Sequence, residues 1–129
     1  MSVPTSVLGW VTRAEEDFAV ARSCLRRVKP LTASASFHAQ QCAEKYLKAL
    51  LVARAQVFPR THDLGALNHL CMAAGINIAV NQNDLDLLSA YAVQVLRYPG
   101  IDPTDVEARQ AIDTAQAVRR FVRRTLGLR

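Results

Sequence analysis

The chain has 129 residues, which is long enough for one domain to bury a hydrophobic core without disulfide or metal support. Half of the residues are apolar and 21% are charged, the composition of an ordinary soluble domain. No apolar segment approaches the roughly 18–20 residues of a membrane-spanning helix, and the N-terminus lacks the pattern of a secretory signal. We therefore expect a single domain over residues 1–129, a cytoplasmic location and no membrane association.

The formal net charge is +5, and arginine supplies most of the positive charge, with 13 Arg against 3 Lys. A guanidinium group donates two parallel hydrogen bonds to a carboxylate or a phosphate, so an arginine-rich face suits nucleic acid or an acidic partner. A surface that serves only solubility would have the same composition. The net charge leaves both interpretations open.

The three cysteines, Cys24, Cys42 and Cys71, lie far apart in apolar stretches. Their odd number and wide spacing argue against a disulfide framework and a zinc site, and we expect buried thiols that act as small hydrophobic side chains. His38 and His69 also lack Cys, His or carboxylate neighbours at the spacing of zinc ligands. We expect no metal site and no cofactor.

The first predicted helix covers about residues 7–28, because apolar residues recur there every three to four positions. Ser6 is a suitable N-cap for it. A second helix is expected from residue 32, 33 or 34 to about residue 55. A short third helix follows over about residues 62–74, and Gly75 is a natural residue to end it.

Residues 76–80 alternate in polarity like a strand, but the chain offers no second strand to pair with, so we expect an extended loop. The fourth helix is predicted over about residues 85–96 and the fifth over about residues 104–126. Thr104 and Glu107 have the spacing of a capping box at the start of the fifth helix. The predicted fold is all-α, an up-and-down bundle of four long helices plus one short helix.

The second helix carries polar residues within an otherwise apolar segment. Gln41, Lys45 and Lys48 form one row, spaced four and three residues apart. Glu44 lies four residues before Lys48, which is the favoured orientation for an ion pair on a helix. One interpretation is a solvated helix face, which the spacing alone favours; the other is a polar groove where helices or subunits meet.

Three motifs, in this order and with these separations, resemble the HEPN domain family. Residues 39–51 read AQQCAEKYLKALL, where the family has A-Q-Q-A-A-E-K-x-x-K-A-L, and Cys42 replaces an alanine. Residues 61–64 read THDL, and residues 97–99 read RYP at the end of the fourth helix. The resemblance covers nearly the whole chain.

The resemblance implies a small helical bundle that forms a homodimer and binds a nucleotide or RNA. In many members the partner protein is a minimal nucleotidyltransferase, with which the domain forms a toxin–antitoxin-like pair. A second helix too apolar for one small bundle to cover also favours a dimer. We expect the polar row of this helix to line a groove that the RYP motif also reaches. The candidates for ligand binding are Gln41, Lys45, Lys48, His62, Arg97 and Tyr98.

Many HEPN proteins are metal-independent ribonucleases that resemble one another in an R-x4-6-H motif, in which arginine binds the phosphate and histidine helps to activate the ribose 2′-hydroxyl. Arg97 stands where the family has this arginine, but the positions for histidine hold Asp102, Pro103 and Thr104. A general base works best with a pKa near the working pH, so Asp102 is a weaker substitute. The only catalytic candidates are Arg97 and Asp102.

A binding module is therefore the first interpretation of this chain, and we expect little or no cleavage of RNA. A ribonuclease with an atypical site is the second interpretation, and a structural dimer without a ligand is the third. His62 and Arg97 also have local explanations. His62 starts a short helix that Thr61 or Asp63 can cap, and Arg97 at a helix C-terminus interacts favourably with the helix dipole.

The last helix carries a group of arginines near its C-terminal end. They are Arg119, Arg120, Arg123 and Arg124, with Arg129 beyond them. Like charges four residues apart repel one another unless an anion compensates. The negative end of the helix dipole, an acidic partner and an RNA backbone each supply such compensation.

Overall fold

The computed structural model describes residues 2–97, 100 and 102–129, without the side chains of residues 93–97. In this part of the chain there are five α-helices and no strand, which confirms the all-α prediction. The helices are α1 (Thr5–Arg26), α2 (Thr32–Ala53), α3 (Leu64–Ala73), α4 (Gln82–Arg97) and α5 (Asp105–Thr125). None of them, over the described residues, is long and apolar enough to cross a membrane.

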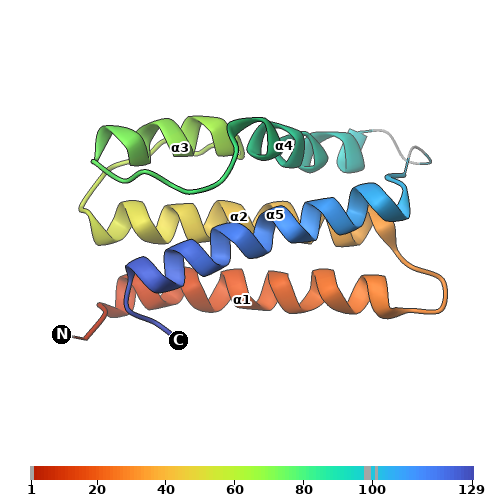
Figure 1. The fold of residues 1–129 in the computed structure, drawn as a ribbon, viewed down its shortest axis with the longest axis horizontal. Coiled ribbons are helices and arrows are strands. Elements are labelled where there is room, and N and C mark those ends of the chain that lie inside the picture. The colour runs from red at the N-terminus through yellow and green to blue at the C-terminus, as the bar shows by residue number, and fades with distance from the viewer. Residues whose placement is uncertain (1, 98–99, 101) are drawn as a thin grey trace.

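Helix α2 is the centre of the bundle and contacts each of the other four helices. It lies in one layer with α5, between α1 on one side and the α3–α4 pair on the other (Figure 1). The N- and C-termini lie at the same end of the molecule (Figure 1). Residues 76–80 connect α3 and α4 without strand pairing, as the sequence predicts.

The apolar row predicted on α2 lies in the core. The fully inaccessible apolar residues of this helix are Ala35, Ala39, Cys42, Ala43, Tyr46, Leu47, Ala49, Leu50 and Leu51. Helices α1, α3, α4 and α5 of the same chain cover them. The expectation that one bundle cannot cover this helix is therefore wrong, and α2 gives no argument for a second subunit.

Side-chain capping explains where α4 and α5 begin. The capping box is confirmed, because Thr104 Oγ1 accepts from the Glu107 amide at 3.1 Å and Glu107 Oε1 accepts from the Thr104 amide at 2.9 Å. At α4, Asn81 Oδ1 accepts from the backbone at 2.7 Å, so this helix starts three residues before the predicted position. Ser6 was the wrong N-cap for α1, because Pro4 stands there and no side chain caps the helix.

Replacing Leu50 by alanine tests the central role of α2. Leu50 is fully buried, and removing a buried leucine side chain costs about 2–5 kcal/mol because a cavity remains. We expect the midpoint of urea unfolding to fall accordingly. The control is Val57→Ala, which changes a side chain that is 92% exposed and should change stability by about 0.5 kcal/mol or less. Equal effects of the two substitutions would contradict the packing described.

Candidate functional site

The polar side of α2 is buried at Glu44 and Lys48 and does not form a solvated face there. The Glu44 and Lys48 side chains are only 5% and 10% exposed, and Lys48 Nζ lies 3.0 Å from Glu44 Oε2. The predicted ion pair is therefore confirmed, but in the interior. The Lys48 ammonium group also lies 5.7 Å from the Trp10 ring centre and 5.6 Å from the Phe58 ring centre, within the range of cation–π attraction.

Glu44 also holds His62, whose Nδ1 lies 2.8 Å from Glu44 Oε1. Since an ionised carboxylate can only accept a hydrogen bond, Nδ1 carries the proton and donates it. Gln40 Nε2 donates to Glu44 Oε1 at 3.3 Å and to the His62 carbonyl at 2.8 Å, which fixes the backbone as well as the ring. The His62 side chain is nevertheless 70% exposed, so its Nε2 is open to a ligand.

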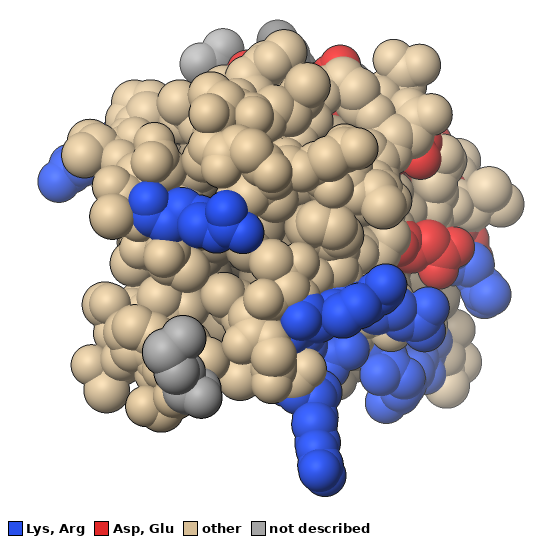
Figure 2. Space-filling view, turned by 60° about the vertical axis from the view of Figure 1, so that its left-hand side comes forward, with Lys and Arg blue, Asp and Glu red and all other residues tan. Residues whose placement is uncertain are grey.

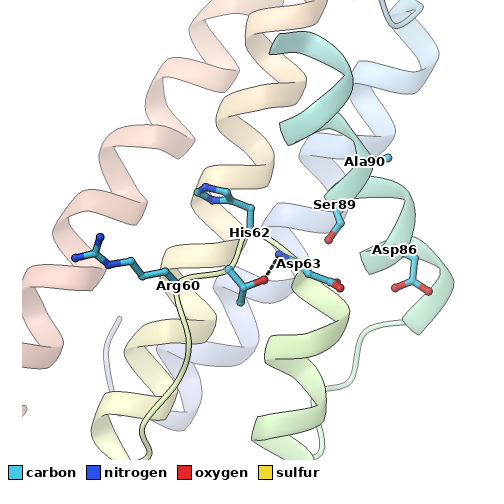
Figure 3. A pocket seen from close by; sticks show the side chains of 7 residues that line it. Arg60, His62, Asp63, Asp86, Ser89 and Ala90 are labelled. Carbon is cyan, nitrogen blue, oxygen red and sulfur yellow. Dashed lines mark hydrogen bonds between the residues drawn. The ribbon is translucent and has the colours of Figure 1, made fainter. Parts of the chain in front are cut away.

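His62 lines a cleft of about 610 Å³ between the α2–α3 loop and α4, which we call the His62 cleft. Its lining residues are Arg60, Thr61, His62, Asp63, Asp86, Ser89 and Ala90. The first four belong to the loop and the last three to α4 (Figure 3). Ser89 Oγ accepts a hydrogen bond from the Leu64 amide at 2.7 Å, which ties α4 to the start of α3. The N-terminal amides of α3 are further satisfied by Asp63.

The side chains of the predicted row have different partners. Lys45 pairs with Asp17 of α1, which also lies 2.8 Å from His38 Nδ1. Gln41 donates to Gln40 Oε1 at 2.7 Å. Of the predicted ligand-binding residues, Lys48 and His62 are brought together, both on Glu44.

The residues at the end of α4 cannot be compared with these. The side chain of Arg97 and the whole of Tyr98 lie outside the described residues, so a groove shared with the α2 row stays a prediction. Asp102 is exposed. No group of three or more His, Cys, Asp or Glu side chains that could hold a metal ion occurs among the residues that the structure describes.

A second polar centre forms around Glu15 of α1. Arg119 donates to the Glu15 carboxylate through Nε at 2.6 Å and Nη2 at 2.9 Å. These bonds lower the pKa of Glu15, although burial opposes the shift, and Glu15 in turn raises the pKa of Arg119. The Tyr46 hydroxyl also donates to Glu15, and burial followed by this bond raises the pKa of Tyr46. The Arg119 guanidinium lies 4.9 Å from the Phe18 ring centre, which further fixes its plane.

The arginines beyond this centre surround a groove of about 280 Å³. We call Arg119, Arg120, Arg123, Arg124 and Arg129 the arginine cluster, and with Leu128 they line the groove. Arg123 is fixed by hydrogen bonds to the Arg129 carbonyl and the Tyr46 hydroxyl. Arg120, Arg124 and Arg129 are exposed, and no ion pair to them occurs within the described ranges. Figure 2 looks onto the end of the molecule that holds both termini and shows Lys and Arg side chains gathered on its lower part.

Two carboxylates of α1, Asp17 and Glu15, have roles that the sequence did not predict. Asp17 lies three residues after Ala14 and next to Phe18, within the apolar stripe of α1, and this position could have revealed its burial. Glu15 gave no such signal, because its partner Arg119 is 104 positions away in the chain. No pattern in the sequence marked Ser89 and Asp86 as site residues either. They line a cleft only because α4 packs against the α2–α3 loop.

The Glu15 centre predicts a specific loss of stability in acid. Because the pKa of Glu15 is lower in the folded state than its ordinary value of 4.5, the unfolded chain binds the proton more tightly. The stabilisation is present above that value and is lost as the pH falls through the folded pKa. We expect the thermal unfolding midpoint of the wild type to fall below about pH 5 more steeply than that of Glu15→Gln.

The control for this comparison is Glu16→Gln, which removes the neighbouring carboxylate. Glu16 is 60% exposed and, among the residues that the structure describes, pairs only with Arg13, at 3.4 Å, so this variant should keep the wild-type dependence on pH. If Glu15→Gln and the wild type lost stability in parallel, Glu15 would not contribute the acid-sensitive interaction.

Comparison with known proteins agrees with this architecture. The HEPN domain family model matches residues 7–125, while no curated protein matches the chain. The structure is similar to the crystal structure of TT1696 from Thermus thermophilus, with a TM-score of 0.72 and 30% identity over 93% of this chain and 98% of that one. It is also similar to ST0689, an archaeal HEPN homologue, with a TM-score of 0.65 and 25% identity over 93% and 97% of the two chains. The chain belongs to the HEPN domain family.

Proposed function

We propose that this HEPN domain binds the phosphate groups of RNA or nucleotides through the arginine cluster. The observation that carries the proposal is the balance of charge in the groove. Five arginines surround it, and Glu15 is the carboxylate that pairs with two of them. An anion bound in the groove would stabilise the remaining positive charges, since like charges within one helical turn repel one another.

The geometry of the cluster favours phosphate as this anion. Arg119 and Arg123 are held in place by Glu15, Tyr46 and the Arg129 carbonyl, so part of the cost of ordering long side chains is already met in the free protein. Arg120 and Arg124 are four residues apart on the same helix and present two exposed guanidinium forks. Arginine binds phosphate bidentately through such forks. Contacts of this kind give affinity without sequence preference.

The HEPN family also supports a partner protein. We propose that the domain works with a minimal nucleotidyltransferase in a toxin–antitoxin-like pair. A gene for a small nucleotidyltransferase beside this one, and co-purification of the two proteins, would support the pair. Stable co-expression without any association would count against it.

Binding of single-stranded RNA tests the role of the arginine cluster. We expect the Arg120→Gln/Arg124→Gln double variant to bind more weakly, and the slope of log affinity against log salt to become shallower by about 1–2, because two phosphate contacts are lost. The matched control is Arg26→Gln/Arg109→Gln, which removes the same charge from exposed positions near the C-terminus of α1 and the N-terminus of α5. Its slope should stay close to that of the wild type.

Equal losses in the two double variants would show a general effect of net charge and would contradict the proposed site. The RNA recovered from these assays should be intact. Cleavage that Arg97→Ala abolishes would instead favour the ribonuclease with an atypical site, in which Asp102 stands near the place of the usual histidine. Absence of both binding and cleavage would favour a structural dimer without a ligand.

We also propose that the domain is a homodimer, and this proposal rests on the HEPN family, whose members often dimerise. Light scattering at micromolar concentration should give about twice the chain mass of 14.2 kDa. A purely monomeric mass that persists as the protein concentration is raised would contradict the proposal.

A further inference from the structure

The His62 cleft contains a hydrogen-bonded pair, Glu44 and His62, that takes no part in the arginine cluster. Glu44 is buried and His62 is exposed, yet the two are joined by a hydrogen bond of 2.8 Å. A carboxylate that holds one ring nitrogen fixes the orientation of the imidazole and leaves the other nitrogen for a ligand. The Nε2 atom can accept from a hydroxyl group or, when the ring carries a second proton, donate to a phosphate oxygen.

Interactions from several elements hold the loop that carries His62 in this position. Gln40 binds the His62 carbonyl, and the Phe58 ring packs on Lys48 and edge-on to Trp10 with ring centres 6.0 Å apart. The loop is thus fixed to α1 and α2 on both sides of residue 60. The cleft exists in the free protein and requires no folding of the loop around a ligand, which lowers the cost of binding.

The opposite wall of the cleft lies against Gly65 at the start of α3. A Cβ atom at this position would lie 2.8 Å from Asp86 Oδ1 and 2.9 Å from Gln82 Nε2. The side chains of Asp86 and Gln82 therefore lie close to the start of α3. Asp86 Oδ1 accepts from Gln82 at 2.9 Å, so its second oxygen is available, and Ser89 Oγ can still donate its own proton after accepting from the Leu64 amide.

The charged and polar groups of the cleft follow an order from Arg60 on the α2–α3 loop to Asp86 on α4. Arg60 extends away from α4, and His62 lies between it and Ser89 (Figure 3). Asp86 stands at the α4 end. A ligand that fits this order carries an anion at the Arg60 end and hydroxyl donors at the Asp86 end. The volume of about 610 Å³ lies within the roughly 300–1,000 Å³ of small-molecule sites.

We propose that the His62 cleft binds a phosphorylated sugar, with the phosphate on Arg60 and His62 and the sugar hydroxyls on Ser89 and Asp86. Asp86 and Asp63 repel a ligand that is anionic along its whole length, so the cleft discriminates against the polyanion that suits the arginine cluster. Among the residues that the structure describes, the two sites share no lining residue. This inference goes beyond the proposed function, because it assigns a second class of ligand to a separate site.

The test is titration calorimetry of the full chain with ribose 5-phosphate, accompanied by ribose and inorganic phosphate as separate ligands. We expect saturable binding of ribose 5-phosphate and at least about tenfold weaker binding of either component, because each lacks one set of charge-assisted hydrogen bonds. Equal affinity for inorganic phosphate would overturn the assignment of the sugar end. Absence of binding to ribose 5-phosphate would overturn the proposal.

Substitutions locate the site. His62→Gln and Arg60→Gln should each weaken binding of ribose 5-phosphate about tenfold, the effect of one charge-assisted hydrogen bond. Arg60 is exposed, so Arg60→Gln should fold like the wild type. It therefore tests the site even if His62→Gln fails to fold. The control is His69→Gln, which changes an exposed histidine of α3 that does not line the cleft. Loss of binding in Arg120→Gln/Arg124→Gln, with none in the cleft variants, would place the ligand in the arginine cluster and overturn the proposal.

Glu44 is a positioning residue in this scheme, so its variant needs a readout beyond affinity. The nitrogen-15 chemical shifts of His62 should report a proton on Nδ1 in the wild type and a mixture of tautomers in Glu44→Gln. Binding of RNA should be the same in all the cleft variants as in the wild type. A Glu44→Gln variant that keeps both the wild-type tautomer and the wild-type affinity for ribose 5-phosphate would show that Glu44 does not position the ring.

Discussion

A carboxylate buried within the central helix is the constraint on which the arrangement of the α2–α3 loop depends. Burying a charged group is costly unless it is paired and fully hydrogen-bonded, and Glu44 meets this demand with Lys48, His62 and Gln40. Removing one partner of such a buried pair typically costs about 3–5 kcal/mol. The α2–α3 loop, which has no helix of its own, is consequently placed by the side chains of α2 rather than by its own backbone.

Three carboxylates of α1 and α2, those of Asp17, Glu15 and Glu44, bind cationic or imidazole side chains from other parts of the bundle and leave other groups exposed. Both carboxylate oxygens of Asp17 have a partner, because His38 binds one and Lys45 binds the other. Glu15 fixes two arginines of α5 while the rest of the cluster stays exposed. Glu44 fixes one edge of an imidazole and leaves the other edge free. The proposed binding groups are therefore those that these carboxylates leave unpaired.

The sequence was sufficient for the helices but only partly for the site. Periodic apolar residues act locally, and so does the capping box, so the five helices were predicted to within about three residues of their observed ends. The Glu44–Lys48 pair was also local and was predicted. Its burial was not, because that depends on Trp10 and Phe58, which approach from distant parts of the chain. The same holds for the Glu15–Arg119 contact, which spacing within one helix cannot reveal.

The two candidate surfaces differ in the ratio of cations to carboxylates, and this difference affects which ligand each surface would select. In the arginine cluster the cations outnumber the one carboxylate that pairs with them, so its field extends into solvent and is screened by salt. In the His62 cleft, Asp63 and Asp86 offset Arg60, so attraction acts only at contact distance and depends on the order of groups along the ligand. Under the two proposals, a polymer of phosphates fits the first surface whatever its sequence, whereas the second surface takes a ligand with one phosphate and hydroxyl groups at a set separation. Discrimination between the two ligands thus comes from where carboxylates are present as much as from where arginines are.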